Sequence, residues 1–209
     1  ELNRTSPKTQ SALLEVMEER QASVEGVTRK LPNPFVVIAT QNPTGASGTQ
    51  SLPDSQLDRF MICVSMGYPA HQDAVALLKG EVWNKISDLE AVLSKETLLG
   101  VQKQVAEIFV HDDLYDYMVS LVEKTRDHEL FSQGASPRGT IALLRMSRAM
   151  AFLEGRDFVT AEDVQNVAAE VLGHRVKLSP YALAESKSPA DCIRVVLGQV
   201  NSPRMGRMN

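Results

Sequence analysis

Two short apolar runs, separated by a polar stretch, constrain the fold of this chain more than any other feature. The first run, 35–39 (FVVIA), is rich in β-branched residues and ends in the polar tip 40–43 (TQNP). A continuous apolar run of this length predicts a strand buried on both faces, as in a parallel sheet covered by helices. The second run, 61–64 (MICV), predicts another such strand. Since ligands bind at the carboxyl ends of strands in open α/β sheets, the polar tip is a candidate site.

The polar stretch between the runs places an arginine at a fixed distance from the first strand. Residues 44–51 are rich in Gly, Ser and Thr, which is typical of a loop. Residues 52–60 (LPDSQLDRF) predict a short helical turn that carries Arg59 to the start of the second run. The sequence therefore predicts a strand with a polar tip, a loop, and then a positioned guanidinium.

The amino-terminal residues predict a helix and a hairpin. Ser6-Pro7 is a good helix start, with serine as the cap and proline in the first turn. Residues 20–31 alternate loosely around Glu25-Gly26, which indicates a hairpin whose glycine supplies a positive φ. An ordinary surface hairpin and a hairpin that grips a client protein remain equally open.

Beyond residue 70 the composition becomes helical. Helices are expected at 72–79, 94–106, 112–124, 136–155 and 160–173, several of them with Ser or Thr caps. The segments show no strand signal, so we expect a small helical bundle. We therefore divide the chain into a first domain at 1–70, a helical domain at 71–186 and a carboxyl-terminal tail at 187–209.

Composition excludes several classes of function. The chain has 209 residues, 43% of them hydrophobic, and a net charge of −4, which argues against a general nucleic-acid or membrane surface. No apolar run approaches the roughly 20 residues that span a bilayer. Cys63 and Cys192 lie outside any CxxC spacing, so we expect two reduced thiols in a cytoplasmic protein, the first in a buried strand. The four histidines lack paired spacing, and we expect no metal site.

Four motifs carry a resemblance to a known family. The segments 1–20 (ELNRTSPKTQSALLEVMEER), 39–43 (ATQNP), 52–60 (LPDSQLDRF) and 67–69 (GYP) resemble, in this order and spacing, the MoxR branch of the AAA+ ATPases. The resemblance runs from the first residue to about residue 176. It implies an α/β plus all-α fold: a partial P-loop-type parallel sheet of two core strands and a hairpin, followed by a helical lid.

The resemblance also implies roles for four residues, each of which has a simpler alternative. Glu1 would polarise the attacking water, although a terminal glutamate is commonly solvated. Asn42 would be the first sensor of the terminal phosphate, although Asn-Pro after a strand is commonly a turn. Arg59 would be an arginine finger acting in a neighbouring subunit; the alternative is a surface pair with Asp58.

The fourth residue, Arg138, would be the second sensor and would bind nucleotide. It follows Pro137 in the first turn of the longest predicted helix. Its alternative is a cation placed at the positive end of a helix, which is unfavourable and itself hints at an anionic partner.

No GxxxxGK[ST] motif occurs in the sequence, and the first residue is not Met. We therefore expect a carboxyl-terminal fragment that lacks the phosphate loop and is inactive alone. The resemblance implies that the intact protein binds ATP and Mg²⁺ between the subunits of a homo-oligomeric, hexameric ring. It also implies chaperone-like maturation or metal-cofactor insertion for von Willebrand A-domain or metalloenzyme clients. A non-catalytic adaptor module that uses the lid for protein contacts is the alternative.

Overall fold

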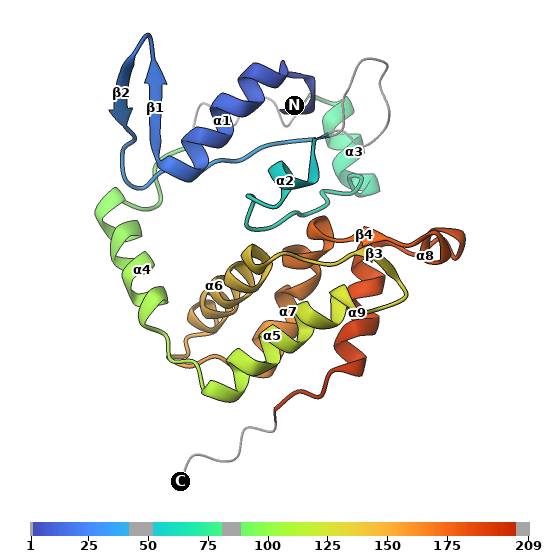
Figure 1. Ribbon diagram of the computed structural model, residues 1–209. Helices are drawn as coiled ribbons and strands as arrows, with labels where there is room; N and C mark the ends of the chain where they lie inside the picture. The colour runs from blue at the N-terminus through green and yellow to red at the C-terminus, as the bar shows by residue number, and fades with distance from the viewer. Residues whose placement is uncertain (1, 42–51, 81–88, 204–209) are drawn as a thin grey trace.

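A computed structural model describes residues 2–41, 52–80 and 89–203. In Figure 1 the amino-terminal segments lie together at one end of the molecule and a helical bundle forms the other, with α4 (Lys95–Glu107) running along one side. The polypeptide crosses between the two parts through this helix.

The amino-terminal part begins as the sequence predicts. It contains η1 (Leu2–Arg4), α1 (Pro7–Glu19), the strands β1 (Gln21–Val24) and β2 (Val27–Lys30), α2 (Asp54–Leu57) and α3 (His71–Leu78). Ser6 caps α1 by accepting a hydrogen bond from the Thr9 N–H at 3.3 Å. The hairpin prediction is confirmed: β1 and β2 pair antiparallel, and Gly26 has a φ of +77° in the turn.

The bundle supplies the hydrophobic core. It is built from α5 (Asp112–Arg126), α6 (Pro137–Leu153), α7 (Ala161–Leu172) and α9 (Pro189–Gln199), with η3 (Gly173–Arg175) and α8 (Pro180–Ala184) between the last two. Their facing side chains are fully buried, among them Leu114, Leu121, Leu143, Leu172 and Ile193. Each such side chain stabilises the fold by about 1.5–3 kcal/mol relative to exposure, so the bundle is the stable platform of the molecule.

The two apolar runs do not pair as strands among the described residues, and this corrects our expectation for them. Val36 and Ile38 are 66% and 90% exposed, and Cys63 is exposed instead of buried. One backbone bond lies just after the first run, where Leu2 N–H donates to Thr40 O (3.1 Å), and another lies within the second run, where Cys63 N–H donates to Glu170 O (2.9 Å). A buried strand requires neighbours on both edges, and the described residues place none beside these runs.

The bundle also differs from the prediction in two places. A short antiparallel pair, β3 (Phe131–Gln133) and β4 (Lys177–Leu178), joins the segments before α6 and after η3. We expected a tail from residue 187, but α9 forms there and buries Cys192, Ile193 and Val196 in the core. Across the described ranges, no helix is both long and apolar enough to cross a membrane.

Candidate functional site

Arg59 lies in the turn that follows α2 and reaches toward α1. Its Nη1 forms an ion pair with Glu18 Oε2 and lies 3.5 Å from the Leu14 carbonyl oxygen. The side chain is 25% exposed. Arg59 therefore pairs with a carboxylate at the molecular surface, and its charge is not enclosed by the hydrophobic interior.

Arg138 approaches the same carboxylate from the bundle. It is the second residue of α6, whose cap Ser136 accepts a hydrogen bond from the Arg138 N–H at 3.1 Å. The Arg138 Nη2 donates to Glu18 Oε1 at 2.5 Å, and its Nη1 lies 3.9 Å from Asp58 Oδ2. A cation at a helix amino terminus is unfavourable by itself, and these two carboxylates supply the anionic partner that its position requires.

Glu18 thus binds two arginines at once, one on each carboxylate oxygen. We call Arg59 and Arg138 the arginine pair. They come from positions 79 residues apart, and Glu18 lies on the last turn of α1, so three separate elements meet at this carboxylate. The side chains of Arg138 and Glu18 are 48% and 44% exposed and that of Arg59 is 25% exposed, so solvent reaches both members of the arginine pair.

Asp58 fixes the segment that carries Arg59 to the bundle. Its carboxylate accepts hydrogen bonds from the Ser136 hydroxyl (2.7 Å to Oδ2) and from Arg175 Nε (3.1 Å to Oδ1). The expected alternative of an Asp58–Arg59 pair is not formed, because the two side chains reach different elements.

Arg175, from η3, is the buried member of this network. Its side chain is 2% exposed, and besides Asp58 it donates to main-chain carbonyls of Asp58, Phe60, Met61 and Val171. Burial lowers the pKa of this guanidinium, and the charge of Asp58 opposes that shift. The residue fastens the segment around Arg59 to the end of α7.

His174 adds a neutral hydrogen bond beside Arg175. Its Nε2 lies 3.1 Å from the Phe60 carbonyl oxygen. Burial, followed by the charge of Arg175, lowers the pKa of the imidazole, so the neutral form that donates to this carbonyl is favoured.

Of the four residues predicted for the site, the structure brings Arg59 and Arg138 together on Glu18. Glu1 and Asn42 lie outside the described residues. Sequence reasoning missed Glu18, on the last turn of α1, and Arg175, in η3. The sequence signal for Arg175 is a basic residue shortly after the end of a predicted helix, which is common on surfaces as well.

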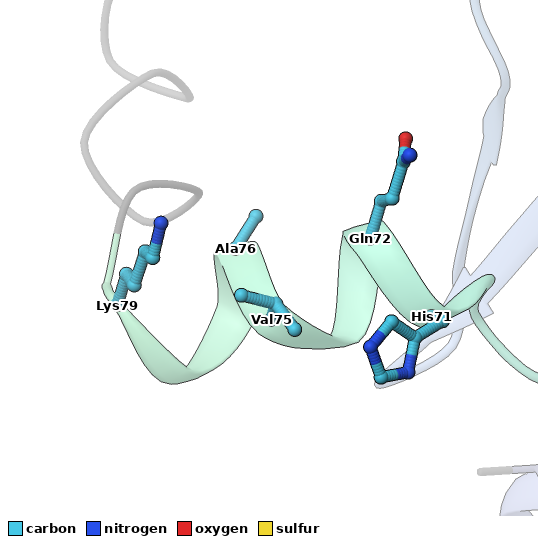
Figure 2. Close-up of a pocket in the computed structure, with 5 residues that line it drawn as sticks. All are labelled: His71, Gln72, Val75, Ala76 and Lys79. Atoms are coloured by element: carbon cyan, nitrogen blue, oxygen red, sulfur yellow. The ribbon is translucent and has the colours of Figure 1, made fainter.

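No metal site emerges from the described residues. They contain no group of three or more His, Cys, Asp or Glu side chains that could hold a metal ion. A shallow hollow runs along α3, and Figure 2 shows Gln72 and Lys79 extending to one side of the helix and His71 to the other. Because these side chains come from one helix and diverge, they do not converge on a ligand.

Family models match both parts of the chain. The model of the ATPase family associated with various cellular activities (AAA) matches residues 1–62, and the model of the AAA lid domain matches residues 123–194. The chain is 43% identical to the uncharacterized protein YeaC of Bacillus subtilis, over 97% of this chain and 64% of that protein. It is 38% identical to the chaperone MoxR1 of Mycobacterium tuberculosis, over 98% of this chain and 56% of that protein.

A solved structure shows the same fold. A crystal structure of a candidate ATPase from Cytophaga hutchinsonii superposes with a TM-score of 0.88 at 34% identity, covering 98% of this chain and 65% of that one. The chain thus spans less than two thirds of the length of each of these three proteins. The expected fold class, an α/β segment of an AAA+ core followed by a helical lid, is confirmed, and the chain belongs to the MoxR-type branch of the AAA+ ATPases.

Proposed function

We propose that this chain is the phosphate-sensing part of an ATPase that hydrolyses ATP at the interfaces between the subunits of a ring. The observation that carries the proposal is the arginine pair: two guanidinium groups converge on one anion at the junction of core and lid. Arginine matches planar and tetrahedral oxyanions through paired N–H donors, so a phosphate group fits the same donors that now hold a carboxylate.

Each predicted residue has a defined task in this proposal. Arg59 neutralises the charge that develops on the terminal phosphate of a neighbouring subunit, and Arg138 couples phosphate occupancy to the lid helix α6. Asn42 orients the attacking water, and Glu1 polarises it. Asp58 and Arg175 hold the Arg59 segment in place, as their hydrogen bonds indicate.

The arginine pair fits the phosphates of ATP, whereas the described residues contain no cluster for Mg²⁺. When bound with the nucleotide, the metal neutralises charge on the phosphate oxygens. By analogy with the relative named as a chaperone, ATP hydrolysis drives the maturation of partner proteins. The clients in this proposal are metalloenzymes or proteins with von Willebrand A domains, and the ring is a hexamer. We place this activity in the cytoplasm.

The test uses a longer protein that carries a phosphate loop ahead of this chain. Arg59→Ala should lower the rate of phosphate release by about 10³-fold or more while ATP binding, measured by titration, is retained. Arg194→Ala, which removes an exposed arginine paired with Asp191 on α9, is the matched control and should leave the rate unchanged. Equal rates for Arg59→Ala and wild type would refute the finger assignment.

Action between subunits has its own test. Glu1→Gln subunits lack the water-polarising carboxylate but keep the finger, whereas Arg59→Ala subunits keep the carboxylate and lack the finger. Mixed rings should regain hydrolysis at interfaces that combine the two intact groups. If mixing inactive variants restores nothing, Arg59 does not act on a neighbour. The 209-residue chain alone should release no phosphate, and an adaptor role would leave every variant of the longer protein equally inactive.

A further inference from the structure

Glu18 has the contacts of an internal substitute for phosphate. Its two oxygens each receive one guanidinium, from Arg138 at 2.5 Å and from Arg59. Two arginines that share one carboxylate also repel each other, and an anion that lies between them offsets this repulsion. An anion that replaces the Glu18 carboxylate would therefore contact both Arg59 and Arg138.

The bonds that Glu18 makes are of the kind that can be exchanged. All three side chains are between 25% and 48% exposed, and exposed ion pairs contribute little net stability. Glu18 lies near the end of α1, and its side chain, 44% exposed, can move from the arginine pair into water. By contrast, the neighbouring Asp58 pairs with the buried Arg175, which also bonds to main-chain carbonyls, and this pair stays in place.

We propose that Glu18 is a displaceable counter-anion: it occupies the arginine pair in the absence of ligand and is expelled when a di- or triphosphate group binds. The inference deepens the proposed function, because it names the group with which nucleotide phosphate competes. Glu18 is therefore a positioning residue that keeps Arg59 and Arg138 adjacent and lowers their apparent affinity for phosphate until a sufficiently charged anion arrives.

The test measures binding of inorganic pyrophosphate to the 209-residue chain at constant ionic strength. Calorimetry gives the dissociation constant, and NMR of the arginine side chains reports which guanidinium groups respond. Removal of the competing carboxylate in Glu18→Gln should tighten binding about 2- to 30-fold, the range given by two exposed ion pairs. The Arg59 and Arg138 signals should shift together, and the signal of Arg194, paired elsewhere, should not.

Two further variants separate competition from net charge. Glu19→Gln removes the same charge from the neighbouring exposed position, which projects about 100° away around the helix, and it should leave the dissociation constant unchanged. Glu18→Asp keeps the charge but shortens the reach to the arginine pair, and it should tighten binding as Glu18→Gln does. Thermal melts establish that each variant is folded. If Glu18→Gln is unfolded, the test rests on Glu18→Asp.

Weaker or unchanged pyrophosphate binding by the folded Glu18 variants would overturn the inference, and so would the absence of binding by all of them. Equal tightening by Glu19→Gln would also overturn it, since net charge would then explain the effect. These results are independent of the subunit-mixing experiment on the longer protein, which can succeed even if Glu18 proves to be a static partner.

Discussion

Loss of the Asp58 carboxylate should destabilise this protein more than its place in a surface turn suggests. Asp58→Ala removes the acceptor of Arg175 Nε (3.1 Å) and of the Ser136 hydroxyl (2.7 Å). Breaking a buried ion pair by deleting one partner costs about 3–5 kcal/mol. We expect the low end, about 3 kcal/mol, because Arg175 keeps its carbonyl partners and Asp58 is 15% exposed.

The measurement is the free energy of unfolding from urea denaturation, supported by thermal melts. For a protein of this size the expected loss corresponds to a decrease in Tm of roughly 6–12 °C. Asp54→Ala is the control, because Asp54 forms an ion pair with Lys177 in which both side chains are about half exposed. That pair should contribute less than about 1 kcal/mol.

A double-mutant cycle then tests the mechanism directly. If Asp58 acts through Arg175, the Asp58→Ala and Arg175→Met changes should not add, since the second removes the charge that the first leaves unpaired. Equal destabilisation by Asp58→Ala and Asp54→Ala, or strict additivity with Arg175→Met, would refute the reasoning.

Three further predictions concern the rest of the chain. Gly134→Ala should lower the free energy of unfolding by about 1–3 kcal/mol, because the new Cβ would lie 2.6 Å from the backbone of Arg126, the last residue of α5. Gly100→Ala, in open space on α4, should be neutral or stabilising, and urea denaturation compares the two variants. Thiol labelling of the folded protein should modify Cys63 rapidly and Cys192 only after unfolding, because Cys192 is buried and burial raises the pKa of its thiol. Since burial lowers the pKa of His174, protonation favours the unfolded state, so the free energy of unfolding should fall as the pH drops below 6.5, and less so in His174→Gln.

Features determined by local sequence were predicted accurately. Ser94, Ser136 and Thr160 each cap the helix that begins after them, and Thr160 completes a capping box with Asp163. The hairpin turn at Gly26 has the positive φ that its sequence requires. Caps and turns depend on residues only a few positions apart, so the local amino-acid sequence is enough to predict them.

Features determined by distant neighbours were not predicted. The apolar run at 35–39 has strand composition, but strands need hydrogen-bonding partners, and Val36 and Ile38 remain exposed in the described part of the chain. Residues 189–199 were weak as an isolated pattern, yet Ile193 and Val196 are buried because α5 and α7 provide the other side of the interface. Composition does not reveal which surfaces meet.

The candidate site illustrates the same distinction and links it to mechanism. Asp58 and Arg59 are consecutive residues, yet their side chains have different partners. The Asp58 carboxylate pairs with the buried Arg175, and the Arg59 guanidinium pairs with the exposed Glu18. Exchange of Arg59 between partners therefore leaves the backbone beside it fixed, because Asp58 is held by the buried Arg175, whereas the partner of Arg59 is the exposed Glu18. Arg138 spans the two networks, with Glu18 at 2.5 Å and Asp58 at 3.9 Å. A phosphate that displaces Glu18 from the arginine pair thus contacts α6 through Arg138 and the turn at Asp58 through Arg59. A phosphate sensor between core and lid requires this connection.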